Sequence, residues 1–276
     1  MNSAGKLYVV GTPIGNLSDL TYRAVKTLEE VDFIAAEDTR VTLKLLNHLG
    51  IKKPMISYFE HNKLQRGDEI CSRILQGENC AIVTDAGMPC ISDPGEELIR
   101  QCAEKGIVTE VVPGPSAVIS ALCVSALPTG RFAFEGFLSV NKKSRREHLE
   151  SLKNETRTMI FYEAPHKLLN TLRDLLDTFG VRKLTIAREL TKLHEEIIRT
   201  TTEEALKFVE ENGIKGEIVL VLEGKPQGED IREYTLEDAV KIANELISSG
   251  ERSTDAAKEA ARITGLKKND IYRELV

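Results

Sequence analysis

The chain has 276 residues, of which 41% are hydrophobic and 29% charged, and it contains no tryptophan. This composition is typical of a globular protein with room for two medium domains, and it excludes a disordered or collagen-like chain. The formal net charge of −6 excludes a protein that binds nucleic acid over its whole surface, so any such contact is expected to be local. No apolar run approaches the roughly 20 residues of a membrane helix. The short polar start of the chain is unlike a signal peptide, so a cytoplasmic location is expected.

The cysteines and histidines indicate no metal centre. The cysteines are widely spaced without a CxxC pair, and the histidines form neither an HxH nor an HExxH pattern. Reduced thiols are therefore expected, and a bound metal is not.

Residues 7–16, with the sequence LYVVGTPIGN, predict a buried strand that ends in a glycine loop. The run up to Val10 is rich in strand-forming residues, and the glycines on either side of Pro13 let the backbone come close to a ligand. Ser18 or Asp19 is expected to cap the helix that follows. A strand, a glycine loop and a helix in this order form the usual mouth of an α/β ligand site.

Strands and helices alternate through the rest of residues 1–127, which we interpret as the first domain. Gly50 is expected to end the second helix in the left-handed conformation, and Asp93 to cap a helix that begins at Pro94. Because helices separate the strands, the pattern predicts a mainly parallel sheet covered on both faces. Its further strands are expected at residues 32–36, 55–58, 80–84 and 108–112.

A change of pattern after residue 127 predicts a second α/β domain, residues 128–225, with a more antiparallel sheet. Residues 141–146 are expected to form a basic loop, and Thr202 to cap the last helix, which ends at residue 212. A further helix is expected at residues 167–179. The strands are expected at residues 132–138, 158–162, 183–187, 195–200 and 217–222.

Residues 226–276 predict a helical tail after a polar linker at 225–230. Helices are expected at 236–248, 254–263 and 269–275, with a turn at 264–266, which is helix-turn-helix spacing but is shared by any small helical hairpin. The tail holds 11 acidic against 8 basic residues, which argues against strong phosphate binding.

Four loops follow strands of the predicted parallel sheet, at residues 11–16, 37–40, 85–95 and 113–117. They therefore share the carboxyl edge at which open α/β sheets bind ligands. The first loop is neither a Walker A loop nor a G-x-G-x-x-G loop, because Gly11 and Gly15 are four residues apart with a proline between them. Glu37 lies at the end of the second strand, where NAD enzymes carry the acid that binds the ribose. The glycine spacing of the first loop nevertheless argues against NAD.

Six motifs in this order resemble the bacterial rRNA small subunit methyltransferase I family, within the tetrapyrrole-methylase-like superfamily: VGTPIGNLSDLT, AAEDTR, TDAGMPCISDPG, VVPGPSA, FYEAPHK and ARELTKLHEE. The resemblance covers residues 7–222. It implies two α/β domains with S-adenosylmethionine in the cleft between them, a homodimer, and 2′-O-methylation of a cytidine ribose in the decoding region of 16S rRNA. The tetrapyrrole enzymes usually carry a G-x-G-x-G-D first loop, which this chain lacks.

The resemblance also implies a cofactor site built from loop and strand-end residues. Glycine-loop amides and strand-end polar groups can bind the ribose, amino group and carboxylate of S-adenosylmethionine. Without the resemblance, Ser116 and its neighbours fit a helix cap equally well. The expected cofactor residues are Pro13, Gly15, Asn16, Asp85, Ala86, Gly87, Ile91, Ser92, Pro115, Ser116, Ala117, Glu163, Ala164 and Leu222.

Methyl transfer to a ribose hydroxyl needs in-line alignment and help in removing the hydroxyl proton, and it requires no metal. The catalytic candidates are Glu189, Lys192, Asp38 and Arg40, with Glu37 as a further carboxylate. The pair of Glu189 and Lys192 is the most suggestive, because a lysine beside a glutamate can hold a proton near the substrate. The alternative is a surface ion-pair network at a strand end.

Lys142, Lys143, Arg145 and Arg146 form the most basic run in the chain. A solvated helix start is the usual explanation of such a run. With an RNA substrate, the same run becomes the expected phosphate contact.

Two other functions stay open. A methyltransferase that acts on a tetrapyrrole or on a protein side chain would keep the same fold and cofactor. A regulator would bind nucleic acid through the helical tail and sense a nucleotide-like ligand with its α/β part. Deletion of residues 226–276 would separate the regulator from an enzyme, because only the enzyme should keep its cofactor site.

Overall fold

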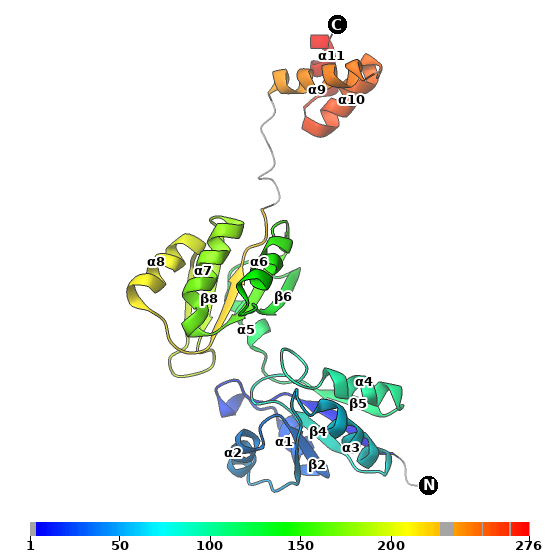
Figure 1. Ribbon diagram of the computed structural model, residues 1–276, viewed down its shortest axis with the longest axis vertical. Helices are drawn as coiled ribbons and strands as arrows, with labels where there is room; N and C mark the ends of the chain where they lie inside the picture. Colours follow the sequence, from blue (N-terminus) through cyan, green and yellow to red (C-terminus); the bar gives the residue numbers. More distant parts are fainter. Residues whose placement is uncertain (1–3, 227–234, 250, 265, 276) are drawn as a thin grey trace. The chain divides into compact units, whose positions relative to one another are not determined.

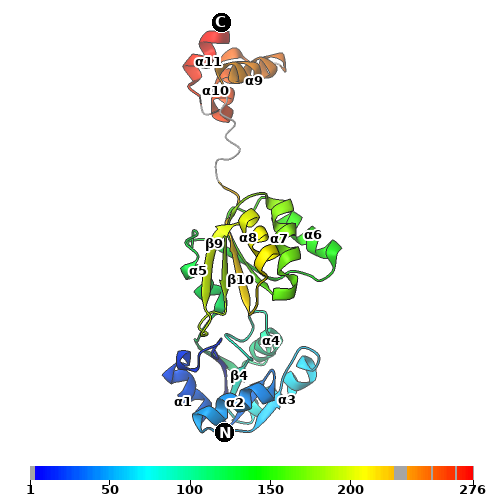
Figure 2. The ribbon, with the colours of Figure 1, turned by 90° about the vertical axis from the view of Figure 1, so that its left-hand side faces the viewer.

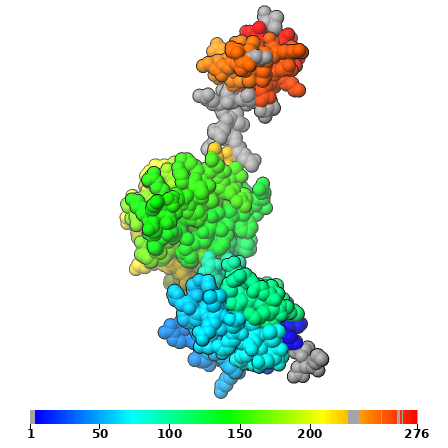
Figure 3. Space-filling model, turned by 45° about the vertical axis from the view of Figure 1, so that its right-hand side comes forward, coloured from blue at the N-terminus to red at the C-terminus, as the bar shows by residue number. Residues whose placement is uncertain are grey.

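The computed structural model describes residues 4–226, 235–249, 251–264 and 266–275. The chain divides into two compact units, Met1–Lys225 and Pro226–Val276. The first unit consists of two lobes, each built on a five-stranded sheet (Figures 1 and 3). The α/β class and the helical C-terminal segment that the sequence predicts are confirmed.

The sheet of the first lobe is parallel throughout, with the strand order β3-β2-β4-β1-β5. The predicted parallel sheet is therefore confirmed. The carboxyl ends of all its strands meet at one edge, and so do the loops that follow them. The strands are β1 (Lys6–Val10), β2 (Phe33–Ala36), β3 (Met55–Ser57), β4 (Cys80–Val83) and β5 (Val108–Val112).

Helices cover both faces of this sheet (Figure 1). One face packs against α1 (Tyr22–Glu30) and α2 (Thr39–Leu49) through a core that includes Leu28 and Leu46. The other face packs against α3 (Lys63–Leu75) and α4 (Glu96–Glu104). Gly50 ends α2 with a φ of 70°, in the left-handed conformation that the sequence predicts.

Two predicted helix caps of the first lobe are wrong. Thr21, and not Ser18 or Asp19, caps α1, because its hydroxyl accepts the amide of Ala24 at 3.1 Å. Residues Leu17–Asp19 form a short 3₁₀ helix instead. Pro94 does not begin α4, which follows Gly95, and the side chain of Asp93 lines a pocket.

The sheet of the second lobe has the order β6-β7-β10-β8-β9, and only β6 and β7 run parallel. The more antiparallel arrangement that the sequence predicts is confirmed. The strands are β6 (Phe132–Phe137), β7 (Thr158–Glu163), β8 (Lys183–Arg188), β9 (Glu196–Thr201) and β10 (Ile218–Leu222).

One face of the second sheet packs against α6 (Lys142–Ser151), α7 (Pro165–Phe179) and α8 (Thr202–Asn212). The other face packs against α5 (Ala117–Val124) (Figure 2). The domain border predicted at residue 127 thus falls after a helix that covers the second sheet. The predicted basic loop at 141–146 is wrong, because Asn141 caps α6 through the amides of Lys143 and Ser144. Thr201, and not Thr202, caps α8.

The second unit contains α9 (Leu236–Ser248), α10 (Ser253–Thr264) and α11 (Lys268–Leu275) around a small core rich in alanine. The three predicted helices are confirmed. Gly265 of the predicted turn and most of the predicted linker at 225–230 lie outside the described residues. Among the residues that the model describes, no helix is long and apolar enough to cross a membrane.

Two glycines bring the first loop against the loop after β5. A Cβ atom added to Gly11 would lie 2.7 Å from the Cα of Gly114 and 2.8 Å from its amide nitrogen. These are backbone atoms, so the contact cannot be relieved by turning a side chain.

Gly11→Ala should therefore lower the free energy of unfolding by roughly 1–3 kcal/mol through overpacking. Urea titration of the purified protein measures this change. Gly130→Ala is the matched control, because no atom lies within 4 Å of the Cβ position there. Equal stabilities for the two variants would contradict the proposed backbone contact.

Candidate functional site

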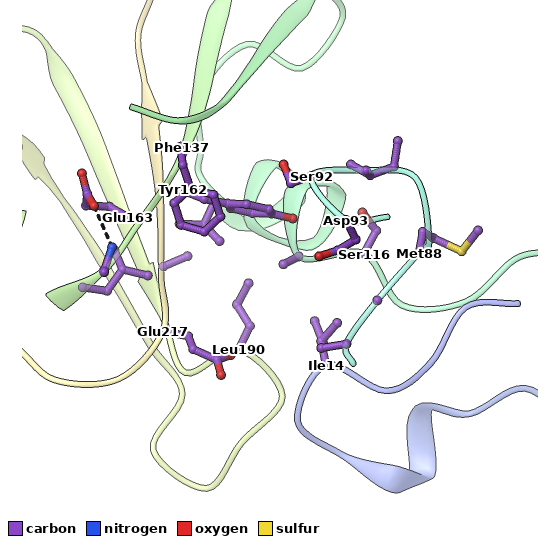
Figure 4. Close-up of a pocket in the computed structure, with 18 of the residues that line it drawn as sticks. Ile14, Met88, Ser92, Asp93, Ser116, Phe137, Tyr162, Glu163, Leu190 and Glu217 are labelled. Carbon is purple, nitrogen blue, oxygen red and sulfur yellow. Dashed lines mark hydrogen bonds between the residues drawn. The ribbon is translucent and has the colours of Figure 1, made fainter. Parts of the chain in front are cut away.

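A pocket of about 350 Å³ lies where the loops of the first lobe face the second sheet (Figure 4). This volume is within the roughly 300–1,000 Å³ range of small-molecule sites. Most of its wall is apolar. The lining residues are Ile14, Ala86, Gly87, Met88, Ile91, Ser92, Asp93, Ser116, Ala117, Phe137, Tyr162, Glu163, Ala164, Pro165, Ala187, Leu190, Glu217, Ile218 and Val219.

The loop after β4 forms one side of the pocket. Thr12 and Gly87 form an isolated antiparallel bridge, and the Thr12 hydroxyl donates to the carbonyl of Thr84 at 3.1 Å. These bonds hold the first loop against the loop after β4. Cys90 and Ser92 have φ values of 73° and 64°, a conformation that residues other than glycine rarely adopt. Such strain is typical of functional loops.

Three carboxyl groups gather at this loop: Glu37 from the loop after β2, and Asp85 and Asp93 from the loop itself. The Thr84 hydroxyl donates to Glu37 at 2.5 Å, and the amide of Asp38 donates to Asp85 at 3.2 Å. Burial raises the pKa of Asp93 to about 6, and the nearby charges of Glu37 and Asp85 add to the rise. Asp93 therefore exchanges a proton near neutral pH, inside the pocket.

Asp38 and Arg40 form a local ion pair outside the pocket lining. The guanidinium of Arg40 bonds to the Asp38 carboxylate at 2.5 Å, and Asp38 also caps α2. The hydrogen bonds from Arg40 lower the pKa of Asp38 to about 2. Asp38 therefore stays ionised at neutral pH and is a weak base.

Glu189, Lys192 and Glu217 form a network at the other side of the pocket. The ammonium of Lys192 lies 3.0 Å from Glu189 and 3.1 Å from Glu217. Burial lowers the pKa of Lys192, but the bonds to the two carboxylates outweigh it and raise the pKa above its ordinary value. The amide of Glu217, followed by Lys192, holds the pKa of Glu189 below its usual range. Lys192 is thus a fixed cation and not a base.

The turn that carries this network also contacts the first loop. Glu189 and Thr191 have φ values of 50° and 67°. A Cβ atom at Gly15 would lie 2.5 Å from Cγ of Lys192 and 2.9 Å from the Thr191 hydroxyl, so the two lobes meet here with no room for a side chain. That hydroxyl is buried and has no hydrogen-bond partner among the described residues.

Several of the predicted cofactor residues come together in the pocket, and others do not. Asn16 caps the 3₁₀ helix, Asp85 accepts the amide of Asp38, and Pro13, Gly15 and Pro115 are outside the lining. Leu222 needs correction, because it is fully buried in the core at the far end of β10 from Ile218. The predicted residues that line the pocket are Ala86, Gly87, Ile91, Ser92, Ser116, Ala117, Glu163 and Ala164.

The pocket residues that the sequence analysis did not predict belong mainly to the second sheet. Tyr162, Ala187 and Val219 lie on neighbouring strands and face the pocket, opposite the face that packs against α6, α7 and α8. The sequence predicted these strands, but the alternation of side chains along a strand does not show which strands pair and so which residues form one wall. Asp93 was interpreted only as the cap of the helix after the loop at 85–95, although a carboxylate in a loop at this edge of the sheet was the signal for a ligand contact.

The basic run at residues 142–146 contains one basic side chain in a covered ion pair and three exposed ones. Arg145 pairs with Asp174 at 2.7 Å and is largely covered, which removes it from the predicted phosphate contacts. Lys142, Lys143 and Arg146 are exposed on the first turns of α6. Lys143 makes a long ion pair, 3.9 Å, with Glu147.

Comparisons with known proteins agree with this architecture. The family model for tetrapyrrole (corrin/porphyrin) methylases matches residues 6–206. Ribosomal RNA small subunit methyltransferase I of Halalkalibacterium halodurans is 47% identical over 270 residues, 97% of this chain and 93% of the relative. The Thermotoga maritima protein of the same name is 53% identical over 221 residues, 80% of this chain and 99% of the relative.

Solved structures share the fold at low sequence identity. Uroporphyrin-III C-methyltransferase of Thermus thermophilus has a TM-score of 0.57 at 20% identity, covering 79% of this chain and 94% of its own. The same enzyme complexed with S-adenyl homocysteine has a TM-score of 0.55 at 19% identity, covering 79% and 97%. These likenesses support the two-lobed α/β fold.

The raised pKa of Asp93 predicts a stability that depends on pH. Because the folded pKa of about 6 lies above the ordinary 3.8, the folded state holds the proton more tightly, and stability falls as the pH rises from about 4 to 6. Asp93→Asn should therefore be more stable than the wild type by roughly 1–3 kcal/mol at pH 7.5, with the difference much smaller at pH 4.

Urea unfolding at both pH values measures this difference. Asp38→Asn is the control of opposite sign, because a pKa of about 2 makes the ionised form of Asp38 stabilising at neutral pH. A difference between wild type and Asp93→Asn that is independent of pH would contradict the raised pKa.

Proposed function

Because the chain belongs to the ribosomal RNA small subunit methyltransferase I family of tetrapyrrole methylases, we propose that it transfers a methyl group from S-adenosylmethionine to small-subunit rRNA. The acceptor that we propose is the 2′-hydroxyl of a cytidine in the decoding region of 16S rRNA. The reaction would take place in the cytoplasm, where the ribosomal subunits are. The observation that carries the proposal is the pocket between the loops of the first lobe and the second sheet.

The residues of the pocket fit S-adenosylmethionine. Ile14, Leu190 and Val219 supply apolar walls for an adenine ring, and Ser92 and Ser116 supply hydroxyls for the polar end. When bound, the cofactor supplies an electrophilic methyl group on a sulfonium centre. The carboxyl of Asp93 suits the neighbourhood of that positive charge.

Asp93 is also the carboxyl that we propose as acceptor of the hydroxyl proton. A general base works best when its pKa lies near the operating pH, and Asp93, at about 6, lies closer to neutrality than Asp38, at about 2. Glu189 and Lys192 are then proposed as positioning residues, since their network holds the 189–195 turn against the first loop. Arg40 would keep Asp38 in place at the start of α2.

A homodimer is proposed on the exposed apolar surface of the first unit. β5 is an edge strand, and Val108 and Val111 on it are 53% and 57% exposed. Ile119 and Val124 on α5, a helix that is apolar except for Ser120, are also exposed. Exposed edge strands and contiguous apolar patches are typical of association surfaces.

Transfer of a labelled methyl group tests the function directly. The protein is incubated with methyl-labelled S-adenosylmethionine and small ribosomal subunits that lack this modification, and the label is mapped by nuclease digestion and mass. We expect label on a single ribose, with a rate that rises through pH 6 in the wild type but not in Asp93→Asn.

Label on a base or on a ribosomal protein would contradict the proposed acceptor. Absence of transfer to subunits and to naked rRNA, despite tight cofactor binding, would overturn the RNA function and point to a small acceptor such as a tetrapyrrole.

Reversal of two charges tests the proposed phosphate contact. Lys142→Glu combined with Lys143→Glu should weaken binding of small-subunit rRNA and lower the slope of log K against log salt by about one per lost contact. Binding of S-adenosylhomocysteine should not change. Lys44→Glu combined with Lys52→Glu is the control, because both side chains are exposed in the first lobe. Equal RNA affinity of the two double variants would refute the contact.

A further inference from the structure

An exposed aromatic ring stands at the edge of the pocket. Phe137 lines the pocket, yet 59% of it is exposed. Its ring packs against Tyr162 with a centroid distance of 5.3 Å and an angle of 56°, and Phe134 packs edge-on against Tyr162 at 5.0 Å. Figure 4 shows the rings of Phe137 and Tyr162 side by side, with Tyr162 reaching toward the loop that carries Asp93. Phe137 is thus the outer ring of a cluster of three.

A β-bulge places Phe137 on this face. In a regular strand, residues three apart point to opposite faces, so Phe134 and Phe137 would not share a neighbour. The register of β6 and β7 shifts between Phe134 and Gly136, and Gly136 has a φ of 65°. The extra residue, Glu135, shifts the alternation of side chains by one position, so the side chain of Phe137 faces the pocket. The bulge therefore exposes a phenylalanine that regular pairing would have directed to the opposite face.

The loop after β4 supports the bulge from the first lobe. A Cβ atom at Gly136 would lie 3.6 Å from the hydroxyl of Ser92, which lines the same pocket. The exposed ring therefore adjoins the proposed cofactor residues, although much of the ring remains open to solvent.

The charges around Phe137 favour the binding of a polyanion on the side of α6 and oppose it on the side of the pocket. Asp93, Glu163 and Glu217 line the pocket, and a phosphate there would meet carboxylates. The exposed lysines Lys142 and Lys143 begin α6 five residues after Phe137. An RNA strand can thus place its phosphates over α6 while a base lies against the ring.

We propose that the exposed face of Phe137 is a stacking site for a nucleobase of the RNA substrate, at or next to the methylated nucleotide. This inference rests on the proposed RNA function. Aromatic side chains beside basic residues are the usual platform for unpaired bases, because every base has a π face. The ring would hold the target nucleotide out of its stack while the ribose faces the pocket.

Substitution of Phe137 tests the site through the Michaelis constant for RNA. Phe137→Ala should raise the KM for small ribosomal subunits by roughly 5- to 150-fold, the effect of losing one stacked base. Phe137→Leu, which keeps apolar bulk without a π face, should also raise it, and Phe137→Tyr should restore it. Phe137 also lines the cofactor pocket, so the dissociation constant of S-adenosylhomocysteine is measured beside the KM, and it should change less than the KM for RNA in all three variants.

An unchanged KM for RNA together with weaker S-adenosylhomocysteine binding would assign Phe137 to the cofactor and overturn the proposal. So would an Ala variant and a Leu variant that both match the wild type. Absence of methyl transfer by the wild-type protein is a different result, because it contradicts the proposed RNA function itself.

The absence of tryptophan from the chain offers a direct optical test. Phe137→Trp introduces one indole, whose fluorescence should be quenched by a single-stranded oligocytidine RNA that stacks on it. Inorganic polyphosphate of equal charge should bind the lysines without this quenching. Phe208→Trp, at an exposed phenylalanine on α8, is the matched control. Equal quenching at both positions, or quenching by polyphosphate, would overturn the stacking site.

Discussion

The rest of the site depends on the close backbone packing of the loop after β1 against its neighbours. β1 lies between β4 and β5, and its loop contacts the loops of both neighbours, through Gly11 on Gly114 and through the bridge of Thr12 with Gly87. The same loop continues to Gly15, which contacts the turn between β8 and β9 in the second lobe. Glycine is needed where two backbones approach so closely, because any Cβ atom would separate them. A parallel sheet brings the loops to one edge, and these glycines let them form one wall.

Electrostatics divides the surface around that wall into two regions. Burial raises the pKa of Asp93, and the carboxyl groups gathered at the edge of the first sheet add to the rise because they disfavour each other's ionisation. A ligand with a positive centre relieves this repulsion, and a phosphate increases it. The exposed lysines Lys142 and Lys143 lie on α6 instead. The cationic cofactor and the anionic acceptor that we propose would therefore occupy different parts of one site, with the methyl group transferred at their border.

The sequence was sufficient for features that depend on short stretches of chain. The parallel sheet and its four loops follow from the alternation of strands and helices, and the end of α2 at Gly50 follows from the φ that glycine allows. The cap of α1 was misplaced because Ser18, Asp19 and Thr21 have similar capping chemistry within one turn. The wall formed by Tyr162 and Val219 depends on which antiparallel strands pair. Leu222 was misplaced because the part of a strand that borders the pocket is decided by tertiary packing.

The helical unit bears on which function the chain can have. The pocket is lined by residues from Ile14 to Val219, all of which belong to the first unit. The unit Pro226–Val276 has its own core of alanines and Ile271, as expected of a part that folds by itself. The Thermotoga maritima relative matches over 221 residues, nearly its whole length, and the first unit has 225. The family model matches residues 6–206, all within the first unit, which argues against a regulator whose function resides in its tail.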